Sequence, residues 1–196
     1  MAKEKTDRAR ILRGAMELLE KRGMEGVNAR AIAAHIGCST QPIYRVYAGM
    51  AELRADMVAA CGAEYERFIA QEQASGQYPP YKAMGMAYAR FAAERPNLFR
   101  LLFMRNRTGE SYDTGEETFR AATEAISHST GLPFEAAAGL HLEMWIFVHG
   151  IGVMLATGYY TMSLERVGEL LSAHYGDLLR RYSAPASADT ERAEHP

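Results

Sequence analysis

Apolar residues recur at the helical period along almost the whole chain. The first apolar stripe predicts a helix that ends at Gly23, and its members are Ile11, Leu12, Ala15, Leu18 and Leu19. Similar patterns predict further helices over about 28–36, 40–48, 50–73, 81–94, 97–104, 116–129, 133–156 and 163–182. Asn28 suits the N-cap of the second helix. No stretch alternates with period two for long enough to form a strand. The pattern therefore predicts an all-α protein of about nine helices.

The segments between these stripes are rich in polar residues, glycine and proline. Residues 74–80 predict a loop, Pro96 a helix stop, and residues 105–115 a mobile loop. The chain from Ser183 onward carries no core residues, so we expect a disordered tail over 183–196. We accordingly divide the chain into an N-terminal head over 1–49, a larger helical body over 50–182, and the tail.

Composition and charge narrow the class of protein. Of 196 residues, 48% are hydrophobic and 23% charged, which is typical of a globular domain and excludes a wholly disordered chain. Two cysteines exclude a disulfide scaffold, no targeting peptide is visible, and the apolar run 144–156 is too short to span a bilayer. These features predict a cytoplasmic protein. Residues 1–54 carry ten basic and six acidic side chains, whereas the remainder is acidic, so the head is the end suited to a polyanion.

Residues 28–47 contain the constraints of two helices joined by a short turn. Ala33 is small where the helices would cross, and Gly37 suits a left-handed turn. Apolar residues at the remaining core positions would hold the pair against a third helix; they are Ile32, Ile36, Cys38, Ile43 and Val46. The Ser39 hydroxyl could cap the next helix, and Pro42 falls in that helix's first turn. This combination predicts a helix-turn-helix.

The second helix of such a motif can lie in the DNA major groove. Gln41 could bind adenine in bidentate fashion, and Arg45 could reach guanine or a phosphate. The predicted DNA-contact residues are Arg30, Ser39, Thr40, Gln41, Pro42, Tyr44, Arg45 and Tyr47. The competing interpretation is an ordinary helical hairpin with a solvated polar face. We favour DNA binding because several constrained positions agree within the basic end of the chain.

The same residues resemble the N-terminal region of the tetracycline-repressor (TetR) family. The similar block covers residues 11–53 and includes Gly26-Val-Asn-Ala-Arg30-Ala-Ile-Ala-Ala-His-Ile-Gly37 and Ser39-Thr-Gln-Pro-Ile-Tyr44-Arg-Val-Tyr47. In one respect the sequence departs from the family pattern. Met50 stands where a lysine often contacts a phosphate, and Gly49 replaces the usual polar cap. We therefore expect the phosphate contacts to come from Arg8, Arg10, Arg30 and Arg45, with Arg54 near enough to help.

The remainder resembles the effector-binding and dimerisation body of such regulators. The segments Glu94-Arg-Pro-Asn-Leu-Phe-Arg-Leu-Leu-Phe103 and Trp145-Ile-Phe-Val-His149-Gly150 are similar to a subgroup with a Trp-x-x-x-His-Gly segment. The resemblance names no effector. It implies a head of three helices on a body that binds a ligand and forms a homodimer.

The body carries a candidate ligand pocket rich in aromatic residues and methionine. Its predicted lining residues are Met84, Tyr88, Phe91, Phe99, Leu102, Phe103, Phe119, His141, Trp145 and His149. An apolar lining favours a lipophilic ligand. The two histidines share a helix face with Trp145, but Glu143 points elsewhere, so we prefer hydrogen-bonded core histidines to a metal site. We predict no metal and no cofactor.

The last two helices carry a predicted self-association face. Gly150, Gly152 and Gly158 would permit close approach of another helix. The predicted interface residues are Ile151, Leu155, Val167, Leu170, Leu171, His174 and Leu178. Two helices from each subunit would form a four-helix interface with twofold symmetry, and hence a palindromic operator.

Three classes of function compete. We favour a homodimeric repressor that a small lipophilic ligand releases from its operator. The alternative is a ligand-independent DNA-binding regulator whose body only dimerises. An enzyme is disfavoured because the chain lacks a Gly-x-Ser-x-Gly elbow, a phosphate-binding Gly-Lys-Ser/Thr loop and a complete Gly-x-Gly-x-x-Gly fingerprint.

Overall fold

The structure is a computed structural model that describes residues 6–106 and 113–184, with side chains from 117 onward in the second range. Within these ranges the chain forms nine α-helices and one short 3₁₀ helix, without a strand, which confirms the predicted all-α fold. Most of the loop predicted over 105–115 and of the tail predicted over 183–196 lies outside the described residues. The elements are α1 (Arg8–Arg22), η1 (Met24–Gly26), α2 (Ala29–Ile36), α3 (Gln41–Val46), α4 (Met50–Ser75), α5 (Pro80–Glu94), α6 (Pro96–Phe103), α7 (Asp113–Thr130), α8 (Phe134–Thr157) and α9 (Leu164–Ser183).

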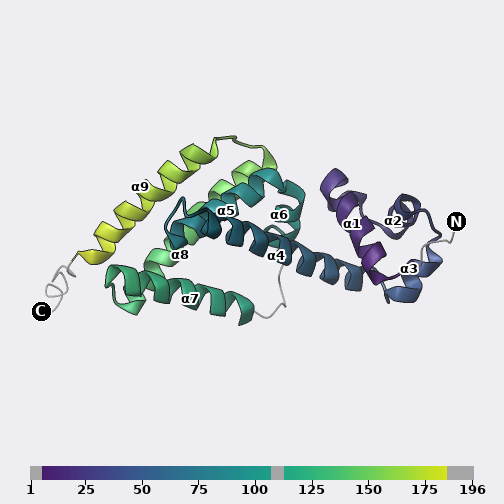
Figure 1. Cartoon of the computed structure of the whole chain (residues 1–196), viewed down its shortest axis with the longest axis horizontal. Coiled ribbons are helices and arrows are strands. Elements are labelled where there is room, and N and C mark those ends of the chain that lie inside the picture. Colours follow the sequence, from purple (N-terminus) through teal and green to yellow (C-terminus); the bar gives the residue numbers. More distant parts are fainter. Residues whose placement is uncertain (1–5, 107–112, 185–196) are drawn as a thin grey trace, which may run out of the picture.

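The molecule is elongated, with the head at one end of its long axis (Figure 1). Helices α1, α2 and α3 form this head, and α4 leads from it into the body. In the body α4 packs against α5 and α6, and α8 packs against α5, α7 and α9. Helix α6 also touches α1, so the body meets the head at two places, α4 and α6.

Two predicted helix ends of the head, at Gly23 and Asn28, are confirmed. Gly23 ends α1 with φ +69°, a conformation that costs glycine little. The Asn28 side chain accepts a hydrogen bond from the Ala31 N–H at 2.9 Å and so caps α2. These local signals depend on neighbouring residues alone, which is why the sequence reveals them.

Three expectations about the body's helix ends are corrected. Pro96 does not stop a helix but begins α6, because proline at the first helical position loses no intrahelical bond; the break falls at Arg95. Pro133 directly precedes α8 instead of lying in its first turn. Gly158, expected to permit close approach of another helix, instead ends α8, with φ +69° and nothing within 4 Å of the place of a side chain.

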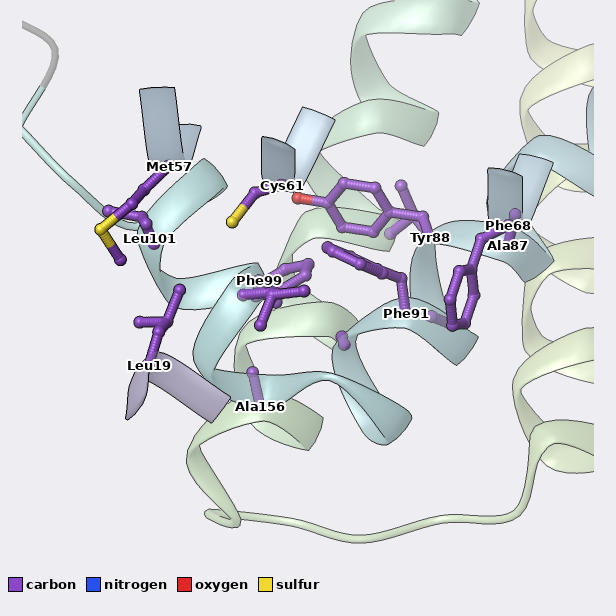
Figure 2. Packing of buried hydrophobic residues seen from close by; sticks show 14 of the residues in the cluster. Leu19, Met57, Cys61, Phe68, Ala87, Tyr88, Phe91, Phe99, Leu101 and Ala156 are labelled. Atoms are coloured by element: carbon purple, nitrogen blue, oxygen red, sulfur yellow. The ribbon is translucent and has the colours of Figure 1, made fainter. Parts of the chain in front are cut away.

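The core is continuous from head to body, and its centre is aromatic. Figure 2 shows Tyr88, Phe91 and Phe99 grouped together near Cys61 of α4. Phe91 and Phe99 have no exposed surface, and Cys61 has none either. Burial raises the pKa of the Cys61 thiol to about 12, so this cysteine is a packing residue.

Helix α8 is the one helix among the described residues that is long and apolar enough to cross a membrane by length and composition. Its 24 residues include His141, Glu143 and His149, and one of its faces packs into the body. Burial of that face in the body accounts for part of its apolar character without a bilayer.

Candidate nucleic-acid interface

Helices α2 and α3 form the helix-turn-helix that the sequence predicts. Gly37 follows α2 with φ +70° and ψ +42°, the left-handed turn expected of it. The Cys38 N–H donates to the Ala33 carbonyl at 2.9 Å and closes the end of α2. Ile32 and Ile43 are buried in the common core of the head. The motif therefore holds α3 by its apolar side.

The opposite side of α3 faces solvent. Tyr44 is 57% exposed, and Gln41 and Arg45 are exposed beside it. Arg30 and Ser39 are exposed as well, whereas Thr40 and Pro42 are half-buried. The structure thus brings a polar side chain, an aromatic ring and a cation together on the outer surface of one short helix.

The expected cap by Ser39 is absent. Helix α3 begins after Thr40, whose backbone is already helical at φ −74° and ψ −19°, and no side chain caps this end. A side-chain cap normally requires an extended backbone at the N-cap residue. Since Thr40 continues the helical path, the first turn is held only by backbone bonds, from Ile43 and Tyr44 to the Thr40 carbonyl.

Tyr47 is not on the contact surface, so its prediction as a DNA-contact residue is wrong. The side chain is 1% exposed, and its hydroxyl donates to Asp56 Oδ2 of α4 at 2.9 Å. Burial raises the pKa of Tyr47 to about 12, and the hydrogen bond to Asp56 adds to this. Helix α3 ends at Val46, and the Tyr47 side chain turns inward to Asp56.

Two arginines expected at the phosphates have partners within the chain. Arg8 donates to both carboxylate oxygens of Asp56, at 2.7 and 2.9 Å, and to Glu52 Oε1 at 2.8 Å. Arg10 donates to the Ile36 carbonyl at 2.8 Å, at the end of α2. Arg30 and Arg45 remain exposed on the helix-turn-helix, and Arg54 is exposed on α4.

Gly49 and Met50, which depart from the TetR family pattern, both have a role at the start of α4. Gly49 is the N-cap of α4 and makes no side-chain bond. Glu52 reaches back instead and accepts from the N–H of Ala48, the residue before the N-cap, at 2.8 Å. Met50 is half-buried and packs against the core. The start of α4 is therefore stabilised without the usual polar cap.

The predicted pocket residues of the body divide into three groups. Tyr88, Phe91 and Phe99 are buried, and Trp145 is 53% exposed on the outside of α8. The remaining side chains are half-buried; they are Met84, Leu102, Phe103, Phe119, His141 and His149. Trp145 does not lie with the others, although His141 and His149, four residues before and after it on α8, both contact tyrosines of α5.

The buried rings pack directly against one another. The Tyr88 ring centroid lies 5.1 Å from that of Phe99 and 4.7 Å from that of Phe103. Two surface hollows occur away from these rings. One, of about 320 Å³, lies in the head beside Arg13 and His35. The other, of about 340 Å³, lies between α8 and α9 beside Ile146 and His174.

Both histidines of α8 are hydrogen-bonded, as expected. Tyr81 Oη lies 2.7 Å from His141 Nδ1, and Tyr88 Oη lies 2.6 Å from His149 Nδ1. Burial lowers the pKa of both histidines. Glu143 points away, as predicted, to Arg181 and Tyr182. Among the described residues no three His, Cys, Asp or Glu side chains are arranged to hold a metal ion.

The predicted interface residues lie mostly inside the protomer. Ile151, Val167, Leu171 and Leu178 are at most 5% exposed, so they contribute to the protomer's own core, and their assignment to a surface is corrected. The other three, Leu155, Leu170 and His174, are half-buried. The large apolar side chains that α8 does expose are Phe134, Leu142, Trp145, Ile146 and Met154, at 46%, 44%, 53%, 61% and 40%.

Gly152 also serves the protomer and not an interface. A methyl group at this position would lie 2.7 Å from Phe99 and 2.8 Å from Tyr88. The glycine therefore lets α8 approach the aromatic rings of α5 and α6. Gly150, two residues earlier, has nothing within 4 Å of that point and lies toward the outside.

A helix-turn-helix head with an exposed recognition helix, joined by one long helix to an α-helical body, defines a class of DNA-binding transcription regulators. Comparison with known proteins identifies the family within that class. Residues 11–57 match the model of the bacterial regulatory proteins of the tetR family. Residues 81–191 match the model of the tetracyclin repressor-like C-terminal domain. The chain belongs to the TetR family.

Solved structures support the same fold. A TetR-like transcriptional regulator from Rhodococcus sp. RHA1 has 15% identity and a TM-score of 0.67, over 88% of this chain and 94% of that one. A protein of unknown function from the same strain has 19% identity and a TM-score of 0.68, over 92% and 97%. A TetR variant from Acinetobacter baumannii AYE in complex with minocycline has 16% identity and a TM-score of 0.58, over 92% and 100%. Comparison of the sequence with curated proteins gives no significant match.

Proposed function

We propose that two copies of this chain form a repressor that holds a palindromic operator through α3 and releases it when a small lipophilic molecule enters the body. The observation that carries the DNA-reading part is the division of α3 into two sides. Ile43 is 1% exposed and anchors the helix, whereas Tyr44 and Arg45 are exposed opposite it. An exposed polar helix face on a helix-turn-helix is what major-groove binding requires.

The exposed residues suit both base edges and phosphates. Gln41 can bind the N6 and N7 atoms of adenine, and Arg45 can bind O6 and N7 of guanine. Arg30 on α2 and Arg54 on α4 flank α3 and are available to phosphates. The protein would act in the cytoplasm, where its operator lies.

The dimer interface that we propose is the outward face of α8 with the adjoining edge of α9. Leu142, Trp145 and Ile146 form an exposed apolar surface on α8. The hollow between α8 and α9 continues it past Phe147 to His174. An apolar surface of this kind on a globular protein marks an interaction site, and family membership favours a second copy as its occupant.

The ligand part of the proposal rests on the chemistry of the body. Tyr88 and His149 form a polar pair within a cluster of aromatic side chains that also holds Tyr65, Phe99 and Phe103. A lipophilic ligand could displace one ring and still find a hydroxyl or an imidazole to bind. Entry between α4, α5 and α8 would move α4, and α4 carries the head. Such a ligand needs a preference of about 1–3 kcal/mol for one of the two states.

The second candidate is a ligand-independent regulator whose body only dimerises. The observation that favours it is the direct contact between the rings, since Tyr88, Phe99 and Phe103 fill the space that a ligand would need. A melting experiment separates the two candidates. A lipophilic compound at 100 times its Kd raises the free energy of unfolding by about 2.7 kcal/mol. If no compound in a broad lipophilic panel shifts the melt, the ligand-independent regulator is the better description.

The test of DNA reading is a selection from fragmented genomic DNA of the source organism. Purified protein is incubated with the fragments, the bound fraction is recovered and sequenced, and the Tyr44→Ala/Arg45→Ala double variant is run in parallel. We expect the native chain to enrich one palindrome and the double variant to enrich none. Equal enrichment by both proteins would show that α3 does not read DNA. No enrichment by either protein at low salt would remove the proposal as a whole.

A further inference from the structure

We propose that Asp56 of α4 is a positioning residue for DNA recognition, which holds α3 in place through Tyr47 and Arg8. The inference rests on the proposed function, because it assigns a residue outside α3 to the reading of DNA by α3. Asp56 itself lies where α1, the end of α3 and α4 meet, through its contacts with Arg8 and Tyr47.

Asp56 accepts hydrogen bonds from two elements of the head at once. Tyr47 Oη donates to its Oδ2 at 2.9 Å, and Arg8 donates to its Oδ2 and Oδ1 at 2.7 and 2.9 Å. The Arg8 guanidinium also lies 4.5 Å from the centre of the Tyr47 ring. Both hydrogen bonds hold the pKa of the Asp56 carboxyl below its usual range, that from Arg8 more strongly.

The recognition helix needs this external support. Helix α3 has only six residues, and no side chain caps its first turn. A helix of this length is not stable by itself, because the cost of nucleation exceeds the gain from so few bonds. Tyr47 is the residue that ends α3, and its N–H donates to the Ile43 carbonyl at 2.9 Å. Fixing the Tyr47 ring therefore fixes the C-terminal end of α3.

The same contacts attach α3 to the helix that leads into the body. Asp56 lies in the second turn of α4, and Glu52, one turn earlier, accepts from Arg8 and from the Ala48 N–H. A rotation of α4 would therefore carry Tyr47 with it. Because Arg8 is held by two carboxylates, it acts in this joint and not as a phosphate contact.

A merely stabilising role is the competing explanation. An exposed ion pair contributes little to stability, and the Arg8 side chain is 49% exposed. The buried Tyr47 ring distinguishes this cluster from such a pair, since its hydroxyl has Asp56 as a charged acceptor. A hydrogen bond to a charged group at a site of this kind is worth about tenfold in an equilibrium constant.

The decisive experiment compares specific with non-specific DNA binding. Asp56→Asn, Tyr47→Phe and their double variant are titrated against the selected palindrome and against a scrambled duplex of equal length. Glu66→Gln, an exposed carboxylate further along α4, is the matched control. We expect each single variant to bind the palindrome about tenfold more weakly, with unchanged or stronger binding to the scrambled duplex. The double variant should be no worse than Asp56→Asn alone, because Tyr47→Phe removes only a hydrogen bond that Asp56→Asn already weakens.

A parallel loss of both affinities, or an unchanged affinity for the palindrome, would overturn the proposal. Hydrogen exchange provides a readout that needs no operator. In Asp56→Asn the amides of α3, with that of Tyr47, should exchange about tenfold faster, while those of α5 and α8 keep their rates. Unchanged exchange in α3 would overturn the positioning role even if the selection finds no palindrome. If the selection finds no palindrome but the α3 amides of Asp56→Asn exchange faster, the proposed function fails, whereas the positioning of α3 by Asp56 is supported.

Discussion

Tyr88 Oη of α5 lies 2.6 Å from Nδ1 of His149 of α8, and this contact is one of two equivalent ones between the same helices. Seven residues earlier on α5, Tyr81 makes the same contact with His141, eight residues earlier on α8. The two helices therefore run parallel and are joined at two points by the same pair of side chains. A neutral imidazole with its proton on Nε2 can accept each phenol hydroxyl.

These pairs predict a pH dependence of stability. Burial lowers the pKa of His141 and of His149 in the folded state. A base with a lowered folded pKa stabilises the protein above its unfolded pKa of about 6.5, and this contribution is lost as pH falls toward the folded value. We expect the melting temperature to fall between pH 7 and pH 5. The His141→Gln/His149→Gln variant should show a flatter profile over that interval, and an unchanged slope would contradict the assignment.

The dimer surface can be tested against the protomer core. Ile146 is 61% exposed, so Ile146→Arg should leave the fold intact and produce a monomer in sedimentation. Leu171 is 3% exposed and packs beside Gly85, so Leu171→Arg should instead unfold the chain, by more than about 4 kcal/mol. If Leu171→Arg instead folds as a monomer, the dimer interface includes the residues that the sequence analysis predicted. A dimeric Ile146→Arg would exclude the outward face of α8.

Two glycines of α8 form a matched pair for measuring packing. In Gly152→Ala the new methyl group would meet Phe99 at 2.7 Å and Tyr88 at 2.8 Å, so the aromatic rings must shift. We expect a loss of about 1–3 kcal/mol in the free energy of unfolding. Gly150→Ala, in open space on the same helix, should stabilise the chain by up to about 1 kcal/mol. Each glycine substitution is introduced into the monomeric Ile146→Arg variant, and its free energy of unfolding is measured with denaturant. Equal changes in that free energy for Gly152→Ala and Gly150→Ala would contradict the packing described.

The roles of two exposed residues of α3 can be separated by salt. Gln41→Ala should relax the preference at one base pair by about 1–3 kcal/mol and leave the salt dependence unchanged. If Arg45 contacts a phosphate, Arg45→Ala should weaken binding to every sequence and lower the salt slope by about one. Arg120→Ala on α7, an exposed arginine far along the chain, is the control. DNA titrations at several salt concentrations measure these effects. If Gln41→Ala and the control have the same affinity and base preference, Gln41 does not contact a base.

The sequence by itself determined the features that depend on near neighbours. The helical period predicted all nine helices, Asn28 predicted the cap of α2, and Gly37 predicted the turn into α3. The same holds for the outer residues of α3, since Gln41, Tyr44 and Arg45 fall opposite Ile43 by helical geometry alone. A motif within twenty consecutive residues was therefore sufficient to indicate a DNA-binding head.

The tertiary structure decided which side of each long helix faces the core. Helix α8 is apolar nearly all round, so its period could not distinguish buried Ile151 from exposed Ile146. Tyr47 and Arg8 were assigned to DNA for a similar reason. Their partner, Asp56, lies nine and 48 residues away in sequence, and only the packing of α4 against the head brings it within 3 Å of both. Contacts between residues far apart in sequence are set by that packing, and no local pattern contains them.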